Sequence, residues 1–232
     1  MYNMGVGFYN MLTPQAYDPS IKWETTLTYN IGVDFGFFDE RLTGSLDAYL
    51  RDTRDLLNSV QIPMGSNFGN KLTTNIGSIR NKGIELSLSG IPVKTNDWSV
   101  LVGFNATLQD TEFTRLNATD DPGYYIETGN ISRGTGNYLC RQMVGYAPYT
   151  YYLYKQKYDS AGKPLQNEFE DLDGDGTITD GDRYMTGKSA APTFYYGMNL
   201  KVTYKEWDFG MNGHGSAGTW VFNDFASSNS TA

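Results

Sequence analysis

Cysteine and histidine each occur only once in this 232-residue sequence, as Cys140 and His214. A single cysteine excludes an intrachain disulfide, and we expect it to be a semi-buried, inert thiol. A single histidine excludes zinc sites built from several histidines and the HExxH chemistry of metalloproteases. No nucleophile, metal triad or cofactor-binding loop stands out in the rest of the chain. We therefore predict that the protein is not an enzyme and assign no catalytic residue.

Long apolar runs are also lacking, because no stretch reaches the roughly 18 residues of a transmembrane helix. Strands of a β-barrel need no such run, since they alternate lipid-facing and lumen-facing side chains. The net charge of −8 argues against a nucleic-acid binder, which would have a basic face. The N-terminal MYNMGVGFYN has neither the basic segment nor the apolar core of a signal peptide. We expect either an internal start at Met1 or a sequence that begins within a longer protein.

What the sequence does contain favours strands and turns: 15% aromatic residues, with 18 Tyr and 12 Phe, and 26 Gly. From 24 to 37 the odd positions are mostly apolar, among them Leu27, Ile31 and Val33, and the even positions are polar or small. This period of two indicates a strand. Similar alternation on both sides of short turns at 38–41, 92–97 and 205–206 predicts three hairpins, over about 24–51, 82–110 and 193–216.

The connections between these hairpins are long, over about 52–81 and 111–192, and all of them emerge on one side. Transmembrane barrels pair short periplasmic turns with long extracellular loops in this way. Aromatic residues gather beside the short turns, as an interfacial girdle would: Phe35, Phe37, Phe38, Trp98, Tyr204 and Trp207. We predict an all-β fold, an antiparallel transmembrane β-barrel segment that forms a partial arc of a large barrel.

A soluble β-sandwich is the alternative, because its strands alternate identically when one face meets a core. In that alternative the chain is a calcium-stabilised carbohydrate-binding module. The two hypotheses differ on the apolar strand positions, which face lipid in a barrel and are buried in a sandwich: Leu27, Ile31, Val33, Val100, Val102, Leu200 and Val202.

The sharpest local motif is DLDGDGTITDGD at 171–182, which fits the D-x-D-x-D-G template of calcium loops. Carboxylates at alternate positions converge on a hard cation, and Gly176 permits the sharp turn. The last position is Asp instead of the usual bidentate Glu, and no helix flanks the loop, so a solvated acidic turn remains the alternative. The candidate calcium ligands are Asp171, Asp173, Asp175, Thr177, Thr179 and Asp182.

A tyrosine-rich stretch precedes this motif. Exposed Tyr stacks on sugars or on a partner protein through its ring and its hydrogen-bonding tip. Alternation over 149–158 equally suits an ordinary hairpin. The candidate ligand or partner contacts are Tyr149, Tyr151, Tyr152 and Tyr154.

An ordered series of segments resembles the C-terminal barrel half of SusC/RagA-type TonB-linked outer-membrane transporters. The segments are DPSIKWET at 18–25, YNIGVDFG at 29–36, GSNF at 65–68, NIGS at 75–78, NKGIEL at 81–86, VGY at 144–146, the acidic run at 171–182 and AP at 191–192. Together they cover nearly the whole chain in order.

That resemblance implies an integral outer-membrane barrel that imports glycans or peptides with energy relayed through TonB, under a SusD-like surface lipoprotein. In such a transporter the long loops face outward and help to hold substrate and partner. The sequence has no counterpart of the family's plug, TonB box or closing strands. We therefore expect that it does not transport on its own.

Overall fold

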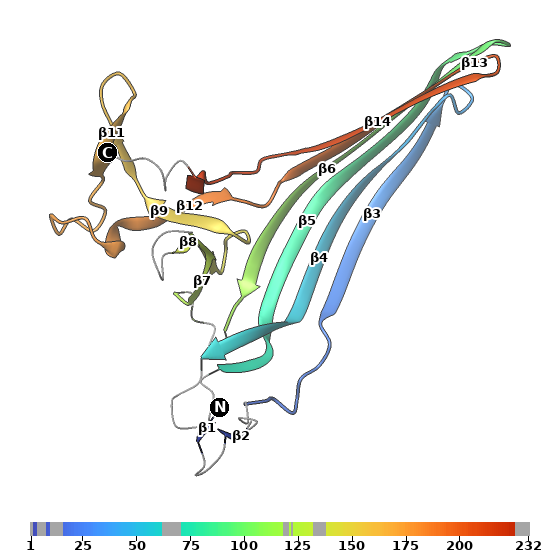
Figure 1. Cartoon of the computed structure of the whole chain (residues 1–232). Helices are drawn as coiled ribbons and strands as arrows, with labels where there is room; N and C mark the ends of the chain where they lie inside the picture. The colour runs from blue at the N-terminus through green and yellow to red at the C-terminus, as the bar shows by residue number, and fades with distance from the viewer. Residues whose placement is uncertain are drawn as a thin grey trace.

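The computed structural model describes residues 2–3, 8–9, 16–61, 71–117, 121, 123–131 and 138–225, so the 65–68 segment lies outside the described residues. Its largest element is a six-stranded antiparallel sheet (Figure 1). In spatial order the strands are β14 (Trp207–Ala217), β13 (Phe194–Tyr204), β6 (Trp98–Arg115), β5 (Lys71–Lys94), β4 (Leu42–Gln61) and β3 (Thr25–Phe37). Within the described residues this sheet does not close on itself. The predicted all-β, antiparallel fold is confirmed.

A smaller β region lies between β6 and β13 in the sequence. Its four-stranded sheet consists of β12 (Arg183–Ser189), β9 (Thr150–Tyr154), β8 (Tyr138–Met143) and β7 (Tyr125–Asn130), in that spatial order. A hairpin of β10 (Gln156–Tyr158) and β11 (Pro164–Phe169) and a 3-10 turn, η1 (Asp180–Asp182), complete it. A separate pair, β1 (Tyr2–Asn3) and β2 (Phe8–Tyr9), lies near the N-terminus. In Figure 1 the smaller sheet lies toward the end of the large sheet that is remote from the short turns.

Strict register divides the six-stranded sheet into two faces. Ile31 pairs with Ala48, and Leu200 pairs with both Val102 and Met211, so apolar side chains share one face across neighbouring strands. We call this the outer face. The intervening positions carry Asn, Ser, Thr, Gly and carboxylates and form the inner face. The two faces follow directly from the period-two sequence pattern.

Among the described residues, no core packs against the outer face of this sheet. Ile31 is 75% exposed, Val33 64% and Phe209 60%. A β-sandwich would bury these side chains between two sheets. The buried apolar side chains of the described residues lie elsewhere, in the smaller region and at the adjoining end of β6: Phe113, Leu116, Cys140 and Tyr151. This distribution is what a lipid-facing wall requires and contradicts the sandwich alternative.

The strands β4 and β5 extend beyond the limits that the sequence predicted. The stretch 52–81 was expected to be a loop, but β4 runs to Gln61 and β5 begins at Lys71. Asp55 adopts a left-handed φ of 61°, and the register shifts between Arg54 and Leu57. Such a bulge places an extra residue in one strand and breaks the alternation. The broken alternation hid this strand extension in the sequence.

The stretch 111–192, which the sequence predicts to be a long loop, also contains strands. The strand β6 continues to Arg115, and the following residues form the smaller sheet instead of an irregular loop. Its strands are only five to seven residues long, apart from the hairpin, so each gives a weak periodic signal.

The aromatic residues beside the short turns lie on neighbouring strands as a girdle requires. The rings of Trp98 and Tyr204, paired across β6 and β13, are 4.4 Å apart between centroids. Phe35 and Phe37 are separated by 5.7 Å. Amphipathic rings in this position favour the interface between lipid and water. Among the described residues there is no helix with the length and apolar character to cross a membrane.

The two faces can be tested by cysteine labelling in the complete protein within the outer membrane, with Cys140 first replaced by Ser. Leu200 and Asn199 are neighbours on β13 that lie on opposite faces. We expect Leu200→Cys to react with a lipid-restricted maleimide severalfold faster than Asn199→Cys, because only the outer face meets hydrocarbon. Equal labelling of the two variants, or protection of Leu200→Cys from every reagent, would contradict a lipid-facing wall.

Candidate functional site

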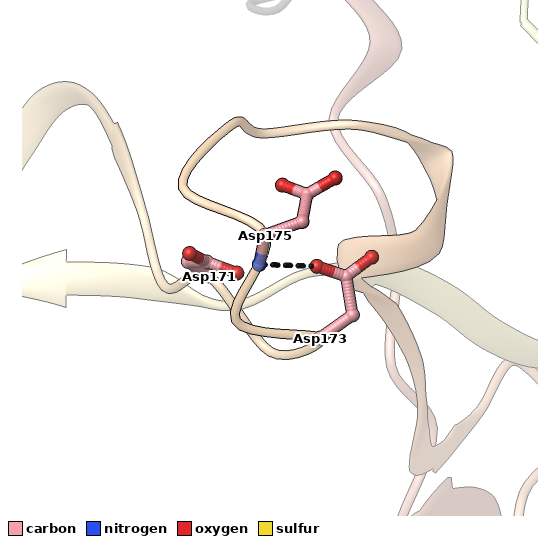
Figure 2. A group of neighbouring side chains, drawn as sticks. All are labelled: Asp171, Asp173 and Asp175. Carbon is pink, nitrogen blue, oxygen red and sulfur yellow. Dashed lines mark hydrogen bonds between the residues drawn. The ribbon is translucent and has the colours of Figure 1, made fainter.

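Three carboxylates of the acidic loop converge, as the spacing predicted. Oxygens of Asp171, Asp173 and Asp175 all lie within 4.8 Å of one another (Figure 2). The loop curls because Gly174 and Gly176 adopt left-handed φ angles of 77° and 83°. Both glycine amides donate to Asp171, at 2.6 and 2.9 Å. Alternate carboxylates are thereby held on the same side of the turn, with oxygens of the type that Ca²⁺ prefers.

The other three predicted ligands, Asp182, Thr179 and Thr177, form hydrogen bonds within the loop. The carboxylate of Asp182 is completely enclosed and accepts backbone N–H groups of Leu172 and Thr179, both at 2.7 Å. The Thr179 hydroxyl accepts the amide of Gly181 and caps η1. The Thr177 hydroxyl donates to Asp175 at 2.8 Å. Asp182 is therefore an anchor that closes the loop, and the structure does not bring it into the cluster of three.

Electrostatics differ between the two kinds of carboxylate. The pKa of Asp182 is lowered, chiefly by the backbone N–H of Thr179 and further by those of Leu172 and Asp173. At Asp173 the backbone N–H of Asp175 acts to lower the pKa, but burial and the neighbouring carboxylates together raise it. The cluster thus holds mutually repelling charges that a bound cation would stabilise.

The four predicted tyrosines differ in exposure, and Tyr152 is intermediate. Tyr151 is 9% exposed and its hydroxyl donates to the carbonyl of Trp220 at 3.0 Å, so it packs the smaller region. The prediction of Tyr151 as a surface contact is therefore wrong. Tyr149 and Tyr154 are accessible, with 52% and 37% of their surfaces exposed. Tyr149 holds a left-handed φ of 58°, which is unfavourable for a bulky residue.

Tyr152 lies within a stack of arginine and tyrosine side chains. The Arg141 guanidinium lies 3.6 Å from the centre of the Tyr152 ring and 3.8 Å from that of Tyr125, and the Arg183 guanidinium lies 4.5 Å from the Tyr152 ring. Both arginines approach Asp180, at 3.7 and 2.9 Å. The stack fastens η1, and with it the acidic loop, to the four-stranded sheet. Sequence reasoning missed it, because the pairs meet only across strands.

The inner face of the six-stranded sheet carries a second candidate site that the sequence did not single out. An open hollow of about 820 Å³ crosses β4, β5, β6, β13 and β14. Its polar lining includes Asp47, Glu85, Asn105, Asn199 and His214. Amides and carboxylates of this kind suit a hydrated, hydrogen-bonding solute. Alternation alone predicted a polar face but not which strands would form the hollow.

Cys140, in β8 of the smaller sheet, is buried, and burial raises the pKa of its thiol. The thiol therefore stays protonated and unreactive at neutral pH. This agrees with the inert role expected from the sequence.

Comparison with known proteins gives concordant matches. A family model described as "TonB dependent receptor-like, beta-barrel" matches residues 2–231. The TonB-dependent receptor SusC of Bacteroides thetaiotaomicron is 42% identical over 227 residues, which are 97% of this chain and 22% of that protein. The TonB-dependent receptor P3 of Formosa agariphila is 29% identical over 231 residues, 92% of this chain and 22% of that protein. The chain thus spans about a fifth of the length of these relatives.

Solved structures agree on the fold. The RagAB peptide transporter superposes with a TM-score of 0.69 at 23% identity, over 89% of this chain and 22% of that one. The RagAB peptide importer in its open-open state gives a TM-score of 0.69 at 26% identity, with the same coverage.

The anchoring role of Asp182 predicts a pH dependence. Because its pKa is lowered by folding, its contribution to loop stability is complete above its unfolded pKa, about 3.9, and is lost as the pH falls through its lower folded pKa. Amide hydrogen exchange at Leu172 and Thr179, corrected for intrinsic rates, should accelerate below about pH 4. In Asp182→Asn we expect severalfold faster exchange already at pH 7. Asp159→Asn, in the β10–β11 turn, serves as the control. Identical exchange in wild type and Asp182→Asn would contradict the anchoring role of Asp182.

Proposed function

This chain belongs to the TonB-dependent receptor-like β-barrel family, and on that premise we propose that it forms wall and extracellular structure of an outer-membrane importer. The members of the family are transporters, and the chain accordingly has binding surfaces rather than catalytic groups to offer. In this proposal the short turns face the periplasm and the smaller β region lies outside the cell.

The observation that carries the proposal is the unequal character of the two faces of the six-stranded sheet. The outer face presents Ile31, Val33 and Phe209 without any covering sheet. The inner face presents Asn105, Asn199 and the rest of the polar hollow. A strand that separates hydrocarbon from an aqueous lumen needs this division, whereas a soluble protein would have to cover the apolar face.

Substrate and partners are proposed for the complete protein. We infer import of glycans or peptides, since one structural neighbour is named a peptide transporter and the lining of the inner hollow is rich in hydrogen-bonding groups. We further infer a SusD-like surface lipoprotein as partner and TonB as the source of energy. The exposed rings of Tyr149 and Tyr154 are the contacts that we assign to substrate or partner.

We also propose that the acidic loop binds calcium as a structural clip. Its support is the convergence of Asp171, Asp173 and Asp175 and the raised pKa of Asp173. A cation there would offset the repulsion among the three carboxylates and hold η1 against Arg183. The ion would order the extracellular region and take no part in transport chemistry.

Import can be tested by deletion of the complete gene. We expect the deletion strain to lose growth on at least one glycan or peptide from a panel of sole nutrients, with uptake of that labelled nutrient reduced about tenfold or more, since outer-membrane passage becomes the limiting step. Restoring the complete gene should restore uptake, and an uncoupler should abolish it. Unchanged growth on every member of a broad panel would contradict an importer.

Calcium binding can be tested by limited proteolysis of the complete protein between Glu168 and Asp182. Calcium should slow cleavage of the wild type severalfold relative to chelator, and Asp173→Ala and Asp175→Ala should each abolish that difference, because each removes a converging ligand. Asp159→Ala, in a neighbouring turn, should retain it. If calcium does not alter cleavage of the wild type, the loop is an ordinary acidic turn.

A further inference from the structure

The outer face changes from apolar to charged over one step of register on β5 and β6, and one step later on β4. Ala48, Ile84 and Leu108 lie opposite one another and form the last fully apolar row, counted from the short turns. In the next row, two residues further along each strand, β4 still carries Leu50, but Lys82 of β5 lies opposite Asp110 of β6 and pairs with it at 3.2 Å. Charges on the lipid face are costly at mid-membrane and tolerated only near the interface. On β5 and β6 the hydrocarbon layer therefore ends between these two rows, and on β4 it ends after Leu50.

The following row reaches the depth of the lipid headgroups. It consists of Asp52, Arg80 and Glu112, with Arg80 Nε 2.8 Å from Asp52. Arg80 lies about three residues beyond the hydrocarbon boundary, which is roughly 10 Å along the strand and 7 Å along the membrane normal at a tilt of about 45°. Headgroups occupy roughly 5–8 Å on each side of the hydrocarbon.

A small hollow of about 120 Å³ opens at this depth. Its lining combines three arginines, three hydroxyl-bearing residues and one carboxylate: Arg54, Arg80, Arg115, Thr53, Ser78, Thr114 and Asp52. Among the described residues, three guanidinium groups line the hollow with one carboxylate, Asp52, and Glu112 lies beside Arg80, so this lining carries net positive charge. Its volume suits one tetrahedral oxyanion and is too small for a sugar ring.

The arginines of the hollow differ in how they are held. Arg80 is fixed by Asp52, and Arg115 Nε donates to the carbonyl of Asn117 at 3.1 Å. The Arg54 side chain is exposed and makes no hydrogen bond or ion pair with the described residues; its charge acts on Asp52 only through space. Its guanidinium is therefore the one available to close on a ligand, while the other two provide a rigid wall.

We propose that this hollow binds the phosphate group of a phosphorylated lipid headgroup in the outer leaflet. Guanidinium groups recognise phosphate through paired, charge-assisted hydrogen bonds, and Ser78 and Thr114 supply additional donors. The occupant is a lipid because Arg54, Ser78 and Arg80 share the face that the apolar rows present to the membrane. The proposal rests on the outer-membrane placement of the proposed function but not on the substrate that is imported.

The test uses the complete protein reconstituted in nanodiscs of zwitterionic lipid, into which a phosphorylated glycolipid is titrated and bound lipid is counted by native mass spectrometry. We expect Arg54→Gln to weaken retention of the glycolipid about tenfold or more, because a charge-assisted hydrogen bond to phosphate is lost. Arg51→Gln is the matched control: Arg51 lies on the same strand but on the inner face, over the Tyr49 ring, and should leave retention unchanged.

Each other outcome is decisive. Equal retention by Arg54→Gln and wild type overturns the proposal, and so does displacement of the glycolipid by millimolar inorganic phosphate, which would assign the hollow to a soluble oxyanion. Resistance of the folded barrel to detergent at room temperature should be the same in all variants, since the Arg54 side chain makes no hydrogen bond or ion pair with the described residues. If the membrane placement itself were wrong, Leu200→Cys would escape the lipid-restricted probe, whereas failure of the headgroup site alone leaves that labelling intact.

Discussion

Each peptide group of a chain that crosses a bilayer must find its hydrogen-bond partner within the protein, because hydrocarbon offers none. The antiparallel ladder of the six-stranded sheet meets this requirement and also sets the two faces of the wall. Since side chains alternate with a period of two, a slip of one residue would turn Ile31 and Leu200 toward the lumen and Asn199 toward lipid. The uninterrupted pairing of β13 with both β6 and β14 prevents that slip.

The same ladder explains which parts of the fold the sequence could predict. Near the short turns the strands alternate cleanly, apart from a register shift between Gly90 and Val93 in β5, so strand positions, faces and the aromatic row follow from the residues alone. Beyond Arg54 the bulge at Asp55 breaks the alternation, and the strand extension disappears from the pattern although its hydrogen bonds continue. Local periodicity reports only on strands without such irregularities.

The candidate sites likewise include features that the local sequence predicts and features that it does not. The carboxylates of Asp171, Asp173 and Asp175 converge because their spacing and the intervening glycines act within one turn, which a local motif describes. The role of Asp182 depends on burial, and the stack around Arg141 depends on which strands become neighbours. Neither property is encoded by residues close in sequence. Long-range packing therefore determines whether Tyr151 and Tyr152 face solvent, and the spacing of the tyrosines in the sequence could not predict it.

The junction between β6 and β13 has a consequence for how such a protein can diversify. The Gln109 N–H donates to the Thr193 carbonyl at 2.8 Å, so the two ends of the intervening β region leave the wall side by side. A segment whose ends meet in this way is topologically equivalent to a short turn, and closing a longer loop adds little entropic cost. Its buried residues are largely its own, as in an inserted domain. Selection can therefore lengthen, shorten or exchange this module while the lipid-facing strands and their register stay unchanged.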